Sequence, residues 1–213
     1  MNSTFLIIVI RSTAPFRICG RPRPVQNKQM QIETERLILR PWKPEDLPVL
    51  AAINQDVHVS EFFLTPLTPE LTQQAVLRYQ TAHDRDGYGF LAAEHKPTGE
   101  LIGIMGMQTM SLHVPGMPQP AVEIGWRLAQ RHWGSGLATE GARAVIHYAF
   151  AVARLPKVVA ITSVINFRSR RVMEKLGMIH LANLDFDHPQ AASGHALQKH
   201  VVYELISESN LPQ

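Results

Sequence analysis

The chain has 213 residues, of which 45% are hydrophobic and 18% charged, so it is long enough to bury the core of one substantial domain. Its 21 lysines and arginines exceed its 18 acidic residues by three, which is too small an excess to predict a nucleic-acid-binding surface. The single cysteine, Cys19, excludes an internal disulfide framework and suits a reducing compartment, and the sequence has no HExxH or CxxC motif that would predict a zinc site.

The first thirty residues contain an apolar run, 5–10, but none of the regular patterning that follows. This run is too short to span a bilayer, which takes about 20 residues, or to form the roughly 7 to 15 residue core of a secretory signal. We therefore expect a cytoplasmic protein without a membrane anchor. Patterned sequence begins at Gln31, directly after Met30. Our hypothesis is that residues 1–30 are a disordered tail, or an upstream extension of a reading frame that starts at Met30.

Apolar spacing predicts the elements of the first half of the chain. Alternation predicts a strand over 33–40, which Pro41 ends. Helical spacing, with a proline in each first turn, predicts two helices over 44–53 and about 69–86. The period then changes to two, which predicts strands over 88–94 and 101–109 joined by a turn at 96–99.

In the second half, the strand predicted over 121–128 alternates clearly. Four apolar side chains share one of its faces, and Glu123, Gly125 and Arg127 share the other. The remaining predicted elements are a helix over 137–153, a buried strand over 158–164, a short helix over 167–176, and strands over 179–186 and 196–205. This order of elements predicts one mixed α/β or α+β domain over residues 31–207, followed by a tail over 208–213.

The glycine-rich segment 130–141, QRHWGSGLATEG, joins a predicted strand to a predicted helix. Gly134 and Gly136 permit positive φ and let a bulky anion approach main-chain N–H groups closely. The first turn of the helix has N–H groups without intrahelical partners and a positive dipole end, so a phosphate can bind there, assisted by Arg131. Taken alone, the glycines fit a simple turn equally well. The segment lacks the GK[ST] of nucleoside-triphosphatase loops and the GxGxxG spacing of dinucleotide-binding folds.

The segment Arg131-x-x-Gly134-x-Gly136, followed by Leu137-Ala138-x-Glu140, resembles the pyrophosphate-binding loop of the GNAT superfamily of acetyl-CoA-dependent N-acetyltransferases. Three further segments, 32–42, 121–128 and 166–178, resemble the branch that includes ribosomal-protein alanine N-acetyltransferases. The resemblance covers about residues 31–206, and four matched segments in the right order are far more specific than one glycine loop.

The resemblance implies a single GNAT-like domain, with a mixed, mostly antiparallel central sheet flanked by about four helices. The sheet is expected to splay between its fourth and fifth strands, where the pantetheine arm of acetyl-CoA lies. The implied cofactor-binding residues are Leu128, Ala129, Arg131, His132, Trp133, Gly134, Ser135, Gly136, Leu137, Ala138, Asn166 and Arg171. Instead of, or as well as, binding the cofactor, Asn166 fits the N-cap of the following helix equally well. At least two of Arg168, Arg170 and Arg171 fit an exposed basic face instead of a phosphate contact.

The implied reaction is attack of a neutral amine on the acetyl thioester, without a metal ion. Glu123 is our candidate for the base that collects the amine proton, acting through one water. The alternative for Glu123 is a salt bridge with Arg127 on the same strand face. A main-chain N–H near Leu128 or Ala129 is expected to polarise the thioester carbonyl.

One position departs from the family pattern. Many relatives place a tyrosine seven residues after the asparagine, as the acid for the leaving thiolate, and here that position is Met173. Either Ser169 or water supplies the proton, or no acid is needed because a thiol of pKa about 8.5 leaves readily as thiolate. If Ser169 has no part in the mechanism, it is a packing or capping residue.

The leading hypothesis is an N-acetyltransferase that acts, as a monomer or homodimer, on a protein N-terminus such as that of a ribosomal protein, or on a small primary amine. Two alternatives are a non-catalytic acyl-CoA-binding or regulatory domain and an antibiotic or amino-sugar acetyltransferase. Neither nucleic acid nor membrane is expected as a partner. The acceptor site is expected across the sheet from the cofactor, and four aromatic residues are candidates for it or for core packing: Trp42, Phe62, Phe63 and Tyr88.

Overall fold

The computed structural model describes residues 30–207. The proposed tail 208–213 and all of the proposed tail 1–30 except Met30 lie outside the described residues, so the hypothesis of a start at Met30 stays a prediction. The side chain of Met30 is buried, and its backbone N–H donates to Nε2 of His83 at 3.2 Å. Between residues 30 and 207, no helix is both long and apolar enough to cross a membrane.

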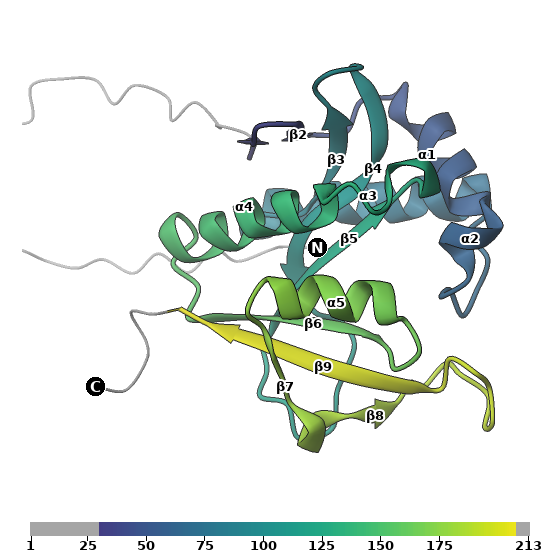
Figure 1. The fold of residues 1–213 in the computed structure, drawn as a ribbon, viewed down its shortest axis with the longest axis vertical. Helices are drawn as coiled ribbons and strands as arrows, with labels where there is room; N and C mark the ends of the chain where they lie inside the picture. The colour runs from purple at the N-terminus through teal and green to yellow at the C-terminus, as the bar shows by residue number, and fades with distance from the viewer. Residues whose placement is uncertain (1–29, 208–213) are drawn as a thin grey trace, which may run out of the picture.

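Within the described residues, nine strands form one sheet in the order β1-β2-β3-β4-β5-β6-β9-β7, and β8 also pairs with β9 (Figure 1). The pairing of β5 with β6 is parallel and the other pairings are antiparallel. The strands are β1 Ile32–Glu33, β2 Leu37–Arg40, β3 Phe90–His95, β4 Glu100–Thr109, β5 Val122–Leu128, β6 Lys157–Ser163, β7 Ile179–His180, β8 Phe186–Asp187 and β9 Lys199–Ile206. This mostly antiparallel, mixed sheet confirms the predicted fold class.

The described residues form five α-helices, one more than the approximate number that the resemblance implied. They are α1 Asp46–Gln55, α2 Val57–Ser60, α3 Pro69–Asp86, α4 Leu137–Ala151 and α5 Phe167–Lys175, with short 3-10 turns at Gln130–His132 and Ala182–Leu184. The short helix α2 was not predicted, because a single turn has too few residues to show a helical period.

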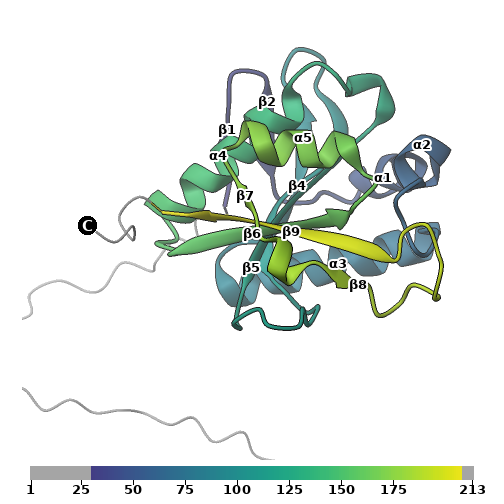
Figure 2. The same cartoon turned by 60° about the horizontal axis from the view of Figure 1, so that its bottom comes forward.

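The helices cover opposite faces of the sheet, α4 and α5 on one face and α3 on the other (Figure 2). The buried side chains Leu137 and Val145 of α4 and Met173 of α5 join the same core cluster as Ile124 of β5. On the opposite face, Leu50 of α1 and Val76 of α3 pack with Ile104 of β4. Each helix buries one apolar stripe, so the two faces of the sheet carry separate cores.

Two predicted strands are divided in the structure. The strand predicted over 33–40 is the hairpin β1–β2, closed by a hydrogen bond from the Thr34 N–H to the Leu37 carbonyl at 2.9 Å. The strand predicted over 179–186 is β7 and β8, separated by the 3-10 turn Ala182–Leu184. The last strand begins at Lys199, not at residue 196, because the chain before it forms turns. A short turn between two strands can leave the alternation of buried and exposed residues unchanged. The apolar pattern therefore does not reveal such a turn.

The sheet opens between β5 and β6. Their only register pair is Glu123 with Val159, after which the two strands separate toward their carboxyl ends. By contrast, β5 pairs with β4 at seven successive positions. The expected splay between the fourth and fifth predicted strands is therefore present, and Glu123 lies where it begins.

Candidate active site

A groove of about 1130 Å³ passes through the sheet at this opening. Both faces of β5 line it, since Glu123, Gly125 and Arg127 contribute from one face and Ile124, Trp126 and Leu128 from the other. The predicted site residues that line it are Glu123, Leu128, His132, Trp133, Gly134, Gly136, Leu137, Ala138, Asn166, Ser169 and Arg171. Three predicted cofactor-binding residues, Ala129, Arg131 and Ser135, do not.

Glu123 is half-buried in the groove wall, and among the described residues its carboxyl group has no hydrogen bond or ion pair. Burial raises its pKa to about 7. The alternative salt bridge with Arg127 does not form, because the Arg127 guanidinium contacts Asn54 and Phe63 instead. A carboxyl group with a pKa near neutrality and a free lone pair is suited to take up and release a proton.

Arg127 has other partners. Its Nη1 donates to Oδ1 of Asn54 at 2.9 Å, and its guanidinium carbon lies 4.2 Å from the centre of the Phe63 ring. Burial lowers the pKa of this guanidinium. Within residues 30–207 it has no carboxylate partner.

One edge of β5 pairs with β4, and the backbone N–H groups on its other edge face the opening toward β6. The Ala129 N–H donates to the Ile102 carbonyl on β4 at 2.8 Å, so it is not free to polarise a thioester. Of the two residues expected to offer this N–H, Leu128 or Ala129, Ala129 is therefore excluded. Because successive residues of an antiparallel strand point to opposite edges, Leu128 and Trp126 direct their amides toward β6 and the groove. The Leu128 carbonyl accepts a hydrogen bond from Nε1 of Trp133 at 2.8 Å.

The glycine-rich turn has the backbone geometry that the sequence predicted. Gly134 has φ +75° and Gly136, the N-cap of α4, has φ +85°. A Cβ on Gly134 would meet no atom within 4 Å, so there is open space beside the turn. Glycine is favoured here because of the positive φ and not because of crowding. No side chain from residues 30–207 caps α4. The first-turn N–H groups of α4 are thus left for an anionic ligand.

Arg36 and Glu140 fix this turn to the rest of the fold. Nη1 of Arg36 donates to the Ser135 carbonyl at 2.9 Å, and its Nη2 pairs with Glu140 at 2.6 Å. Burial alone would raise the pKa of Glu140, but hydrogen bonds from Thr34 and Arg36 outweigh it and hold this pKa below its usual value. The structural role of Arg36 was not predicted, because its two partners lie about a hundred residues away.

Arg131 does not face the groove. Its guanidinium pairs with Glu100 at 3.7 Å and is largely exposed, so a direct contact of its side chain with the cofactor is not supported. Arg168 pairs with Glu61 and lies 4.7 Å from the Trp133 ring centre, and Arg170 donates to the Val164 carbonyl.

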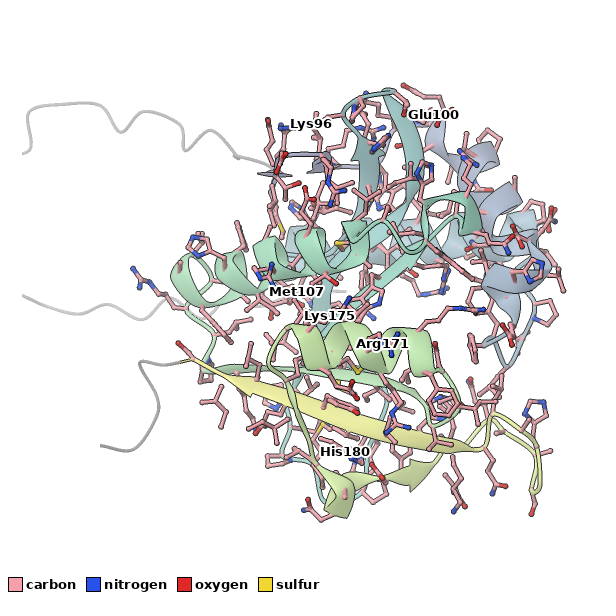
Figure 3. All side chains as sticks on the ribbon, in the orientation of Figure 1. Lys96, Glu100, Met107, Arg171, Lys175 and His180 are labelled. Carbon is pink, nitrogen blue, oxygen red and sulfur yellow. The ribbon has the colours of Figure 1, made fainter. Side chains whose placement is uncertain are left out.

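Arg171 and Lys175 line the groove and have no ion pair within the described chain. They lie one turn apart on α5, the helix beside α4 (Figure 3). On the α5 side of the groove, these two cations are thus available for phosphate.

Asn166 is the N-cap of α5, as one of its two predicted roles required. Its Oδ1 accepts from the Ser169 N–H at 3.2 Å, and its Nδ2 donates to Oγ1 of Thr162 at 3.0 Å. The second N–H of this amide stays free for a ligand. The Ser169 hydroxyl has no hydrogen-bond partner among the described residues, whereas Met173 is buried in the core.

Aromatic residues surround the groove on the α2–α3 side. Phe62 and Phe63 line it as candidates for the acceptor site, and so do Tyr79 and Phe90, which were not predicted. Trp42 is instead a core residue, whose indole N–H donates to the Phe90 carbonyl at 2.9 Å. Tyr88 does not line the groove, and its hydroxyl lies 3.2 Å from Oγ1 of Thr109.

Comparison with known proteins identifies the fold and the family. A family model described as an acetyltransferase (GNAT) domain matches residues 36–179. The chain is 31% identical over 153 residues to the uncharacterized protein YkkB of Bacillus subtilis (strain 168), covering 71% of this chain and 87% of the relative. An acetyltransferase structure from Agrobacterium tumefaciens matches with a TM-score of 0.65 and 27% identity, covering 92% of this chain and 99% of the other. The ribosomal-protein-S5-alanine acetyltransferase of Vibrio fischeri matches in fold, with a TM-score of 0.68, 18% identity and coverage of 86% and 100%.

Proposed function

The chain belongs to the GNAT family of acetyltransferases, and from this premise we propose that it transfers the acetyl group of acetyl-CoA to a primary amine by direct attack on the thioester. The observation that carries the proposal is the uncapped amino-terminal end of α4, which opens onto the same groove as the unpaired carboxyl group of Glu123. The groove joins an anion-binding backbone to a candidate base.

The proposed cofactor site lies on the α4–α5 side of the groove. Main-chain N–H groups from Gly134 to Ala138 hold the pyrophosphate at the positive end of the α4 dipole. Arg171 and Lys175 add charge-assisted contacts to phosphate oxygens, because neither is neutralised by a carboxylate of the described chain. The amides of Trp126 and Leu128 face the pantetheine arm, and the free N–H of Asn166 is a further donor to it. Acetyl-CoA supplies the activated acyl group.

The proposed base is Glu123. An α-amino group has a pKa of about 8 and a lysine side chain one of about 10.4, so the amine must lose a proton before it can attack. With a pKa of about 7, Glu123 is mostly ionised above neutrality and can accept this proton through one water. The Leu128 N–H, on the free edge of β5, is the proposed donor to the developing oxyanion. The nitrogen forms the bond to the acetyl carbon, the carbon–sulfur bond breaks so that the thiolate leaves, and the surplus proton on the nitrogen passes to water.

The thiolate leaves without a fixed acid at the position of Met173, whose side chain has no proton to give. If Ser169 supplies the proton, a Ser169→Ala variant will turn over more slowly. We expect instead that its kcat stays within about two-fold of the wild type across pH 6 to 9, because a thiol of pKa about 8.5 leaves as its anion. Steady-state thiol release measured over this pH range decides between the two, and a kcat loss that grows with pH would assign the acid to Ser169.

The acceptor is proposed to be a peptide N-terminus, such as that of a ribosomal protein, or a small amine. In support, the α2–α3 side of the groove is lined by aromatic side chains and opens opposite the proposed cofactor side. The fold likeness to the Vibrio fischeri enzyme agrees with the peptide acceptor but does not select it.

Thiol release from acetyl-CoA, measured with a panel of N-terminal peptides and small primary amines, tests the proposal. We expect amine-dependent release with at least one acceptor class and formation of the acetylated amine in mass spectra. Binding of acetyl-CoA in calorimetry, without release for any amine, would favour a non-catalytic acyl-CoA-binding domain, which Met173 also fits. A crystal soaked with acetyl-CoA would show which side of the groove faces the thioester.

A further inference from the structure

Arg127 is a charged side chain in the wall of the groove whose positive charge no acidic residue of the described chain neutralises. Its one hydrogen-bond partner is the neutral amide of Asn54, and one face of its guanidinium is covered by Phe63. Asn54 is itself buried and held by Thr72, to which it donates at 2.9 Å. The guanidinium is therefore fixed in position rather than free to swing into solvent.

A fixed, partly buried guanidinium normally has an anionic partner, because taking its charge out of water is costly unless it is paired. The two acidic residues that line the groove do not provide one. Glu123 lies four residues away along the strand and makes no ion pair with Arg127, and Glu174 accepts a hydrogen bond from the Tyr203 hydroxyl on the α5 side. Of the other arginines beside the groove, Arg168 pairs with Glu61 and Arg170 donates to the Val164 carbonyl, whereas Arg171 lies on the proposed phosphate side.

The free donors of Arg127 remain accessible from the groove. Nη1 is used by Asn54, while Nε and Nη2 have no hydrogen-bond partner within residues 30–207 and are not among the fully buried, unpartnered polar atoms. Two adjacent N–H groups on a planar guanidinium match the two oxygens of a carboxylate. Nε and Nη2 of Arg127 can thus donate two parallel hydrogen bonds to a ligand carboxylate.

Arg127 shares the β5 face of Glu123, on the side opposite α4 and α5 where the acceptor is proposed to enter. From these observations we infer that Arg127 binds a carboxylate of the acceptor, so that the preferred substrate is a primary amine that also carries a carboxylate. This inference rests on the proposed function. Because Glu123 and Arg127 are four residues apart on one face of β5, the acceptor must carry its amine and its carboxylate at separate ends, several bonds apart.

Two matched pairs of acceptors test the inference in the wild-type protein. The small-molecule pair is 5-aminopentanoate and pentylamine, and the peptide pair is Ala-Asp-amide and Ala-Asn-amide, each pair differing in the carboxylate. We expect kcat/KM to be at least ten-fold higher for the acidic member of one pair, and the pair that responds identifies the source of the amine. Equal kcat/KM values within both pairs would overturn the inference while leaving the acetyltransferase activity intact.

Arg127→Met and Arg127→Lys variants show whether this residue carries the preference. We expect the acid-to-neutral ratio to fall to about one in Arg127→Met, mainly through KM, and to be only partly restored in Arg127→Lys, which keeps the charge but not the two parallel N–H donors. The control is Arg78→Gln, an exposed arginine of α3 outside the groove, which should keep the wild-type ratio. A ratio unchanged in Arg127→Met would assign the preference elsewhere and reject the inference.

Equilibrium binding separates failure of the inference from failure of the proposed function. Calorimetric titration of the CoA-loaded protein with 5-aminopentanoate or pentylamine requires no turnover. Tighter binding of the acid, lost in Arg127→Met although CoA affinity is retained, would support the inference even if no amine were acetylated. Retained CoA affinity also shows that the variant is folded.

Discussion

Replacing Glu123 with glutamine is expected to lower kcat for amine acetylation by about 10²- to 10⁴-fold, with little change in the affinity for acetyl-CoA. The amide has nearly the shape of the carboxyl group but cannot accept the proton that the attacking amine must lose. In the wild type, kcat/KM expressed per concentration of neutral amine should rise with pH through a midpoint of about 7, because the ionised carboxylate is the active form. The variant should lack this rise. Thiol release at saturating acetyl-CoA, from pH 5 to 9, measures both effects.

The stability of the same variant checks the raised pKa without reference to activity. Folded Glu123 keeps its proton up to about pH 7, whereas the unfolded chain releases it near 4.5, so the wild type loses stability as the pH rises between these values. Glutamine removes this loss. We expect Glu123→Gln to be about 1 to 3 kcal/mol more stable than the wild type at pH 8 and to gain almost nothing at pH 4.

Glu45→Gln is the matched control, since Glu45 is exposed at the start of α1 and lies outside the groove. It should change neither the pH profile nor the denaturation midpoint appreciably. A Glu123→Gln protein that keeps the wild-type kcat, or a wild-type profile without a midpoint near 7, would remove Glu123 from the mechanism.

Replacing Gly134 with aspartate is expected to weaken acetyl-CoA binding by more than about 100-fold. The residue at 134 has φ +75°, and a side chain there extends into the open space where the pyrophosphate is proposed to lie. A carboxylate at this point repels phosphate and competes for the N–H groups of the first turn of α4. Calorimetric titration with acetyl-CoA at two salt concentrations measures the loss and its electrostatic part.

Two further variants separate charge from backbone strain. Gly99→Asp places the same residue at φ +69° in the β3–β4 turn, also with no atom within 4 Å of the new Cβ, so it matches the strain without touching the groove. It should lower the melting temperature about as much as Gly134→Asp and leave acetyl-CoA binding unchanged. Gly134→Ala carries the strain without the charge and should weaken binding less. If folded Gly134→Asp binds acetyl-CoA as tightly as the wild type, the phosphate site is not at this turn.

Much of the β5 wall of the groove was predictable from local pattern. Alternation along one strand is enough to assign Glu123 and Arg127 to the same face, because successive side chains point to opposite sides. The positive φ of Gly134 and Gly136 was also predictable, since a strand-to-helix turn rich in glycine uses backbone conformations that other residues avoid. These features depend on neighbours within a few residues.

Two expectations about the groove, for Ala129 and Arg131, are not supported by the structure. Each depends on a partner residue in a neighbouring strand of the sheet. A free N–H was expected at Leu128 or Ala129, and Ala129 is excluded because its N–H donates to the Ile102 carbonyl of β4. Arg131 was expected beside the phosphate, but its guanidinium pairs with Glu100 of the neighbouring β3–β4 hairpin. In both cases the competing partner is about thirty residues distant in sequence.

The sequence by itself determined the order of the main elements, the faces of β5 and the glycine turn before α4, because each is set by steric limits and apolar periodicity over a short stretch of chain. Only the tertiary structure decided that Glu123 has a raised pKa and no partner among the described residues, that Arg127 is held by Asn54, and that Arg36 and Glu140 fix the turn. Charge, burial and hydrogen bonding are properties of a side chain's full surroundings, and those surroundings come from segments up to about a hundred residues apart.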